Sequence, residues 1–264
     1  MKLISDFQKY KESSKKISMV TCYDAWSARV VEQSEMDCIL VGDSVAMVVH
    51  GFDSTIPATT QMIATHVAAV RRGAPTKIII GDMPFLSVRR GLQAAMEDVQ
   101  AIMQAGATCV KIEGVDGHES IIKHIVESGV PVMGHIGLTP QSVHQLGGFK
   151  VQGKSMSEAQ KILDQAKKLQ ELGAFAVVLE CIPNGLAEEI TQSITIPTIG
   201  IGAGQRVDGQ VLVMQDLLGM NIYFKPKFLR TYLDGFSAFK GSLNQFNQDV
   251  KTLSFPSLEE SYDL

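Results

Sequence analysis

The segment that decides the fold reads KIIIGD and spans residues 77–82. A short apolar run rich in β-branched residues, followed by glycine and an acid, is typical of a strand buried in a parallel sheet. Runs of the same kind recur along the chain, so we expect eight buried strands. They span residues 17–23, 38–42, 77–81, 109–113, 130–135, 175–180, 198–201 and 211–215.

Segments with helical periodicity lie between several of these strands and end at a glycine, which is a common helix stop signal. They span residues 93–105, 119–128 and 157–172. In the third segment, Ser157 and Gln160 have the spacing of a capping box. Its apolar residues form one stripe and leave the charged residues for solvent. The stripe consists of Ile162, Leu163, Ala166, Leu169 and Leu172.

The unit of helix, glycine, strand and turn repeats from about residue 25 to residue 220 without a Pro- or Ser-rich linker. Eight strands in 264 residues favour an α/β fold of the (β/α)8 TIM barrel type over a doubly wound sheet, which usually has fewer strands. We therefore predict a single domain over residues 1–264, with the barrel at about 17–225. We expect C-terminal helices and a tail at 226–264, with the tail extended from Phe255 to Leu264.

Composition and charge exclude several classes of partner. The chain carries 24 basic and 28 acidic side chains, a net charge of −4, and no basic run longer than Arg71-Arg72. This balance argues against nucleic acid and anionic membranes as partners. Residues 1–16 lack the apolar stretch of a signal peptide. The four cysteines are far apart and lie in or beside apolar runs, so we expect reduced core cysteines and a cytoplasmic protein.

Four acids stand at the C-terminal ends of predicted strands, where barrel enzymes build their active sites. Asp43 follows the second strand and Asp82 the third, while Glu113 ends the fourth strand and Glu180 the sixth. A single acid could simply begin a surface loop, but four acids on different strands predict a shared site. Lys111 lies two residues before Glu113 on one strand, so both side chains should point to the same side.

Converging carboxylates repel one another, and without a counter-charge some of them would stay protonated. A divalent cation would neutralise them. Three acidic oxygens that leave room for water and a chelating substrate suit Mg²⁺ better than Ca²⁺, which takes more protein ligands. Zn²⁺ is a poorer match because no His or Cys cluster accompanies the acids. The spacing alone therefore favours a metal-dependent barrel enzyme.

Seven short motifs occur in order along the chain and together resemble one enzyme family. They read VGDS (41–44), HGFDST (50–55), AAVRRGA (68–74), GDMPF (81–85), VKIEG (110–114), GHIGLTPQ (134–141) and IGIGAG (199–204). Each motif alone is weak, but seven in register are highly specific for the ketopantoate hydroxymethyltransferase family. The resemblance covers about residues 21–232, with a fainter match in the tail. Ala46, where the family more often has Gly, and residues 221–225, which align poorly, depart from the pattern.

The resemblance implies a (β/α)8 barrel that uses Mg²⁺ to transfer a one-carbon unit from 5,10-methylenetetrahydrofolate to 3-methyl-2-oxobutanoate. The product is 2-dehydropantoate (ketopantoate), formed in the first step of pantothenate synthesis. By the same resemblance, Asp43, Asp82 and Glu113 occupy the metal-ligand positions. Ser44 and Lys111, with Asp43 and Asp82, occupy the positions that contact the keto acid. The family likeness also implies a homodecamer of two stacked five-membered rings.

In that chemistry the branched carbon of the keto acid loses a proton, and a chelated metal stabilises the enolate. Lys111 would add a positive donor toward a substrate oxygen. The resemblance makes Glu180 the general acid or base, which either takes this proton or delivers one to a folate nitrogen. His135 ends the fifth strand and either bonds substrate or metal-bound water, or is an ordinary core histidine. No role is assigned to His50, His66, His118, His124 or His144, which are not at ligand spacing.

Two other functions stay open. A folate-independent, Mg²⁺-dependent 2-oxo acid lyase or mutase, of the phosphoenolpyruvate mutase and isocitrate lyase type, would use the same acids. Such lyases typically carry a catalytic cysteine in a Lys-Cys-Gly-His-type loop, which this sequence lacks. A catalytically silent barrel that only binds a 2-oxo acid and a metal is disfavoured by the presence of Lys111 and Glu180.

Overall fold

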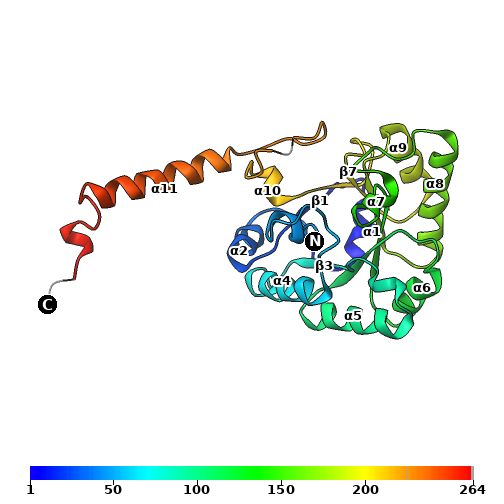
Figure 1. Cartoon of the computed structure of the whole chain (residues 1–264). Coiled ribbons are helices and arrows are strands. Elements are labelled where there is room, and N and C mark those ends of the chain that lie inside the picture. Colours follow the sequence, from blue (N-terminus) through cyan, green and yellow to red (C-terminus); the bar gives the residue numbers. More distant parts are fainter. Residues whose placement is uncertain (224, 263–264) are drawn as a thin grey trace. The chain divides into compact units, whose positions relative to one another are not determined.

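Eight parallel strands in the described part of the chain close into a barrel in sequence order (Figure 1). This computed structural model describes residues 1–223 and 225–262, and it confirms the predicted (β/α)8 TIM barrel. The strands begin and end within three residues of the predicted bounds. They are β1 (Ile17–Thr21), β2 (Cys38–Val41), β3 (Ile78–Asp82), β4 (Cys109–Glu113), β5 (Val132–Gly137), β6 (Ala176–Glu180), β7 (Thr198–Ile201) and β8 (Gly209–Leu212).

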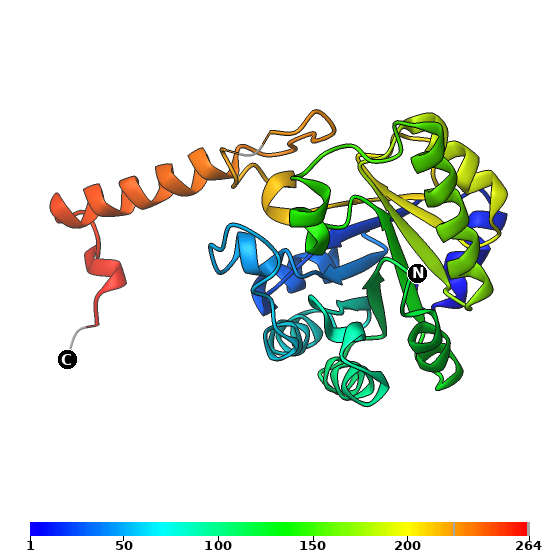
Figure 2. The same ribbon diagram turned by 45° about the vertical axis from the view of Figure 1, so that its right-hand side comes forward.

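Helices surround the outside of the barrel, as the two views of Figures 1 and 2 show. The α-helices up to β8 are α1 (Ser5–Glu12), α2 (Ala25–Gln33), α3 (Val45–Val48), α4 (Thr60–Gly73), α5 (Leu92–Gln104), α6 (Glu119–Glu127), α7 (Val143–Leu146), α8 (Met156–Glu171) and α9 (Asn184–Ser193). Two 3₁₀ turns, η1 (Ser87–Arg89) and η2 (Pro140–Ser142), lie in the loops after β3 and β5. Among the described residues, none of the helices combines the length and apolar character needed to cross a membrane.

The start of α8 differs from the sequence prediction. The capping box is formed by Ser155 and Glu158, not by Ser157 and Gln160. Ser155 has an extended backbone and accepts a hydrogen bond from the Glu158 N–H, while the Glu158 carboxylate accepts one from the Ser155 N–H. A carboxylate in the first turn also interacts favourably with the helix dipole, an advantage that the Gln160 amide lacks.

Apolar side chains at alternate strand positions fill the lumen of the barrel, because residues two apart on a strand share a face. They are Ile17, Met19, Cys38, Leu40, Ile78, Ile80, Cys109, Met133, Ala176, Val178, Ile199 and Val211. Phe7 of α1 belongs to the same cluster and its ring lies 5.0 Å from that of Phe175, just before β6. The amino-terminal end of the lumen is therefore closed and apolar, which leaves the carboxyl end for polar groups.

The chain divides into two compact units, Met1–Val213 and Met214–Leu264. This division describes compactness only, and the single domain expected from the sequence stays a prediction. In the second unit, α10 (Met214–Leu217) precedes the long helix α11 (Gly235–Lys251), in keeping with the predicted C-terminal helix. The tail was expected to be extended, but it contains a 3₁₀ turn, η3 (Leu258–Glu260), in which Ser257 and Glu260 form a capping box. Residues 263–264 of that tail lie outside the described residues.

Gly81 of β3 offers a test of packing between the barrel and α5. A Cβ at this position would lie 2.3 Å from Ile102 Cγ2. We expect Gly81→Ala to lower the free energy of unfolding by about 1–3 kcal/mol because overpacking forces shifts of rotamer or backbone. At Gly185 of α9 a Cβ would meet nothing within 4 Å, so Gly185→Ala should be neutral or stabilise by up to about 1 kcal/mol. Urea unfolding of both variants measures the difference, and equal effects would contradict the packing argument.

Candidate active site

Ionisable side chains form a layer above the apolar lumen, at the carboxyl ends of the strands. Four of them lie two residues beyond a lumen residue on the same strand, and therefore on the same face. The pairs are Ile80 and Asp82, Cys109 and Lys111, Met133 and His135, and Val178 and Glu180. Glu113 lies two residues beyond Lys111 in turn, and its carboxylate is 3.8 Å from the Lys111 ammonium. The prediction that Lys111 and Glu113 point to one side is confirmed.

The ammonium group of Lys111 lies at the centre of this layer. Lys111 Nζ lies 3.0 Å from Asp82 Oδ1 and 3.8 Å from Glu113 Oε1, and its side chain is 4% exposed. Burial lowers the pKa of Lys111, but the charges of Asp82, Glu113 and Asp43 outweigh that effect and raise the pKa above its usual value. Lys111 therefore carries a fixed positive charge at neutral pH.

Asp43 and Asp82 are close neighbours, because the Asp43 backbone N–H donates to Asp82 Oδ2 at 3.0 Å. Burial raises the pKa of Asp43 well above its usual range, and the charges of Asp82 and Glu113 raise it further. Burial also raises the pKa of Asp82, even though Lys111 opposes this effect. The two aspartates thus experience the excess of negative charge that the sequence predicted.

His135 joins two of the predicted site residues. Its Nδ1 lies 3.2 Å from Glu113 Oε1, and its Nε2 lies 3.1 Å from Glu180 Oε2. Burial and the nearby Lys111 lower the pKa of His135, but hydrogen bonding to Glu113 and Glu180 outweighs both and raises it to about 9. Burial has the opposite effect on Glu113 and raises its pKa, but His135 and Lys111 outweigh burial and lower the pKa of Glu113 below its usual value. His135 thus bridges two carboxylates, and its Nδ1 also lies 3.1 Å from Lys111 Nζ.

Gln141, which follows β5 in η2, was not singled out from the sequence. Its side-chain Nε2 donates to Asp43 Oδ2 and to the Met83 carbonyl, both at 2.9 Å. Its backbone N–H donates to Glu113 Oε2 at 3.1 Å. One residue thus connects the loops after β2, β3 and β5 with the end of β4. Its place at the end of the GHIGLTPQ motif was the only sequence signal for it.

Ser44 lies beside Asp43 and is held by a buried tyrosine to which no sequence signal pointed. The Tyr23 hydroxyl and Ser44 Oγ are 2.7 Å apart. Burial raises the pKa of Tyr23 above its usual range, so its hydroxyl stays protonated and is able to donate this bond. Tyr23, which lies two residues after β1, therefore orients Ser44.

The charged layer suits a bound cation, because its carboxylate oxygens are buried and are the kind of ligand that a hard cation prefers. Among the described residues, Asp82 Oδ1 and Glu113 Oε1 are buried oxygens without a well-formed hydrogen bond, and their ion-pair partners are the Lys111 ammonium and the His135 ring. Among the described residues, no three His, Cys, Asp or Glu side chains form a ready metal centre. Lys111 contacts both Asp82 and Glu113, and Gln141 contacts both Asp43 and Glu113. Such donors suit an ion that takes few protein ligands and completes its shell with water and substrate, as Mg²⁺ does.

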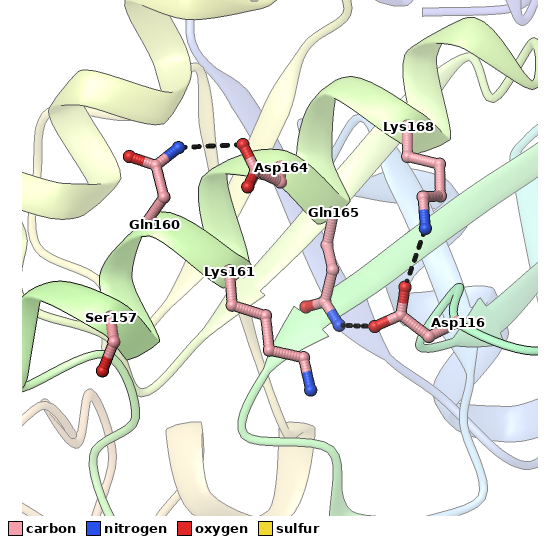
Figure 3. Close-up of a pocket in the computed structure, with 7 residues that line it drawn as sticks. All are labelled: Asp116, Ser157, Gln160, Lys161, Asp164, Gln165 and Lys168. Atoms are coloured by element: carbon pink, nitrogen blue, oxygen red, sulfur yellow. Dashed lines mark hydrogen bonds and ion pairs between the residues drawn. The ribbon is translucent and has the colours of Figure 1, made fainter.

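A surface pocket of about 360 Å³ lies apart from this layer, along α8 (Figure 3). Its polar groups pair mainly with one another: Asp116 accepts hydrogen bonds from Gln165 at 2.7 Å and from Lys168 at 3.0 Å. None of the predicted site residues lines it. The lining residues are Asp116, Ser157, Gln160, Lys161, Asp164, Gln165 and Lys168. We therefore take the charged layer, and not this pocket, as the candidate active site.

Comparison with known proteins agrees with the motifs. The family described as ketopantoate hydroxymethyltransferase matches residues 2–258 of the chain. The chain belongs to the ketopantoate hydroxymethyltransferase family. It is 59% identical over 255 residues to the 3-methyl-2-oxobutanoate hydroxymethyltransferase of Coxiella burnetii (strain Dugway 5J108-111), with 96% of each chain covered. It is 58% identical over 262 residues to that of Bdellovibrio bacteriovorus, covering 99% of this chain and 100% of the relative.

Solved structures of other enzymes share the fold at low sequence identity. A phosphonopyruvate hydrolase in complex with oxalate and Mg²⁺ superposes with a TM-score of 0.63 at 11% identity, covering 98% of this chain and 93% of the other. A 2,3-dimethylmalate lyase of the PEP mutase/isocitrate lyase superfamily gives 0.58 at 14% identity, covering 98% and 91%. These similarities extend to the barrel fold alone, whereas membership of the ketopantoate hydroxymethyltransferase family makes the chain a one-carbon transferase.

The crowding of negative charge leads to a prediction about stability and pH. An acid whose pKa is raised on folding weakens the fold once the pH exceeds its unfolded pKa, by about 1.4 kcal/mol for each tenfold change in its acidity constant. In EDTA at pH 8 we therefore expect Asp43→Asn to raise the free energy of unfolding by at least about 1 kcal/mol, and to change it little at pH 4. Adding Mg²⁺ should stabilise the wild type more than the variant.

Urea titrations at the two pH values, with EDTA or Mg²⁺, measure this effect. The control is Asp53→Asn at an exposed position, which should leave both the pH dependence and the Mg²⁺ response as in the wild type. A loss of stability in Asp43→Asn at pH 8 would show that Asp43 is not held in a repulsive site.

Proposed function

We propose that this chain transfers a hydroxymethyl group from 5,10-methylenetetrahydrofolate to 3-methyl-2-oxobutanoate, with water, giving tetrahydrofolate and 2-dehydropantoate (ketopantoate). This is the first step of pantothenate synthesis. The observation that carries the proposal is the buried layer of acids around Lys111 in a chain of this family. The low-identity hydrolase and lyase structures share the barrel and do not favour a folate-independent reaction.

Charge stabilisation is the first task of the site. In this proposal Asp43, Asp82 and Glu113 hold Mg²⁺, which would supply Lewis-acid stabilisation of negative charge on the keto acid when the branched carbon loses its proton. Lys111 adds a permanent positive charge in the same layer, already fixed 3.0 Å from Asp82. Ser44, oriented by the Tyr23 hydroxyl, donates to an oxygen of the keto acid.

Proton transfer is the second task, and we assign it to Glu180. Its side chain is 18% exposed, against 4% for Glu113, so it is the more accessible of the two carboxylates from the mouth of the barrel. His135 holds one oxygen of Glu180 at 3.1 Å and leaves the other for substrate. Glu180 then either takes the proton from the branched carbon or delivers a proton to a folate nitrogen.

Assembly and location complete the proposal. We propose a homodecamer of two five-membered rings, working in the cytoplasm. An apolar stripe on α11, three or four residues apart and between 39% and 69% exposed, supports association because such stripes favour contact with another surface. It consists of Phe236, Phe239, Leu243, Phe246 and Val250. The unpaired cysteines Cys22, Cys38, Cys109 and Cys181 are consistent with a reducing compartment.

Proton exchange tests the site without the folate. In D₂O with Mg²⁺, we expect the wild type to exchange the proton on the branched carbon of 3-methyl-2-oxobutanoate, followed by NMR. Glu113→Gln should slow this exchange by roughly 100-fold or more and weaken Mg²⁺ binding, because it removes a buried negative ligand. Glu171→Gln, at an exposed position of α8, is the matched control and should exchange at the wild-type rate.

The second half of the same experiment adds 5,10-methylenetetrahydrofolate and follows the formation of ketopantoate. Exchange that never leads to a folate-dependent product would favour the lyase or mutase alternative. Normal exchange in Glu113→Gln would remove Glu113 from the metal site, and no exchange in the wild type would indicate a binding protein without activity.

The stripe on α11 gives a separate test of assembly. We expect Leu243→Asp to lower the mass of the particle measured by light scattering after size exclusion, because it introduces a charge into an apolar contact. Gln248→Asp adds the same charge on the opposite side of α11 and should leave the mass unchanged. An unchanged mass in both variants would exclude the stripe from the assembly contact.

A further inference from the structure

Two histidines face each other outside the charged layer. His50 Nε2 lies 3.0 Å from His66 Nε2, and the two rings are nearly perpendicular at 78°. His50 follows α3, whereas His66 lies within α4, 16 positions along the chain. Sequence spacing gave neither residue a role, but the fold brings the two rings together.

The backbone holds His66 in the orientation of a metal ligand. His66 Nδ1 lies 2.6 Å from the carbonyl oxygen of Tyr23. Because a carbonyl only accepts, Nδ1 must carry the hydrogen, and in the neutral ring Nε2 then presents its lone pair toward His50. Histidines that bind metals usually donate their other N–H to such a carbonyl or to a carboxylate.

We propose that His50 and His66 bind a borderline-soft divalent cation of the Zn²⁺ class through their two Nε2 atoms. Two nitrogens on one tetrahedral Zn²⁺ lie about 3.3 Å apart, so the pair needs to open by only a few tenths of an ångström. His50 is exposed and His66 half-buried, which leaves room for water to complete the coordination.

The chemistry of the donors separates this site from the carboxylate layer. Imidazole suits Zn²⁺, Ni²⁺ and Cu²⁺, whereas Mg²⁺ prefers oxygen ligands. Mg²⁺ in excess should therefore fill the carboxylate layer and leave the histidine pair free. The inference does not depend on the proposed reaction, since neither His50 nor His66 has a part in it.

A cation at the pair would act on the segment that carries Ser44. His50 closes the turn after α3, with its backbone N–H 3.2 Å from the Val45 carbonyl. His66 holds the carbonyl of Tyr23, and the hydroxyl of the same tyrosine holds Ser44. Binding would thus fasten the loop after β2 to α4 and stabilise the folded state by mass action.

Calorimetric titration of the full chain with Zn²⁺, in saturating Mg²⁺, tests the proposal. We expect one Zn²⁺ per chain in the wild type, and an affinity at least about tenfold lower in His50→Gln, since one of two imidazole ligands is lost. Glutamine keeps a donor toward His66 Nε2, so the variant should stay folded, as circular dichroism would verify. Thermal unfolding with and without Zn²⁺ should show a stabilisation that the variant loses.

Two further variants separate this site from other sources of binding. His124→Gln, at an exposed position of α6, should bind Zn²⁺ as the wild type does. Glu113→Gln should also keep this binding, whatever its effect on proton exchange, so the proposed function and this site can fail independently. No Zn²⁺ binding by the wild type, or equal affinity in His50→Gln, would overturn the proposal and reduce the pair to a hydrogen bond between neutral imidazoles.

Discussion

The candidate site depends on the ion pairs that the buried Lys111 ammonium makes with Asp82 and Glu113. Four carboxylates, those of Asp43, Asp82, Glu113 and Glu180, meet the Lys111 ammonium and the His135 ring in one layer. Burying unpaired charge is expensive, and removing one partner of a buried ion pair typically costs about 3–5 kcal/mol. Lys111 therefore lets the acids approach one another, yet it does not neutralise them, and the remaining negative charge favours a bound cation.

Most of the barrel could be predicted because its signals are local. Short apolar runs, glycine stops and acids after strands all act within a few residues, so β4 and β7 were predicted at their observed bounds. The last strand shows the limit of such reasoning. The most apolar stretch there begins at Val211, but β8 begins at Gly209, where a Cβ would lie 2.5 Å from the Ile17 carbonyl. Contact with β1, which is distant in sequence, sets that boundary.

The site was only partly predictable for the same reason. Period-two alternation on β4 gave Lys111 and Glu113 a common face, and acids at strand ends gave Asp43 and Asp82. Gln141 could not be found this way, because its partner Asp43 lies 98 positions away and an amide in a loop carries no pattern of its own. The role of His135 was equally open until the fold placed Glu113 and Glu180 on its two nitrogens.

The apolar lumen also determines the geometry of the charged layer. Ile80 of β3 pairs with Cys109 of β4 in the apolar part of the lumen, and the same register places Asp82 beside Lys111 two residues later. A slip of one residue would turn every side chain of a strand to the opposite face. The packing that excludes such a slip is apolar and lies below the site, whereas the charges above it repel one another. The apolar residues of the lumen therefore keep the carboxylates and Lys111 together at its mouth, and the stability of the lumen is a condition for the geometry of the charged layer.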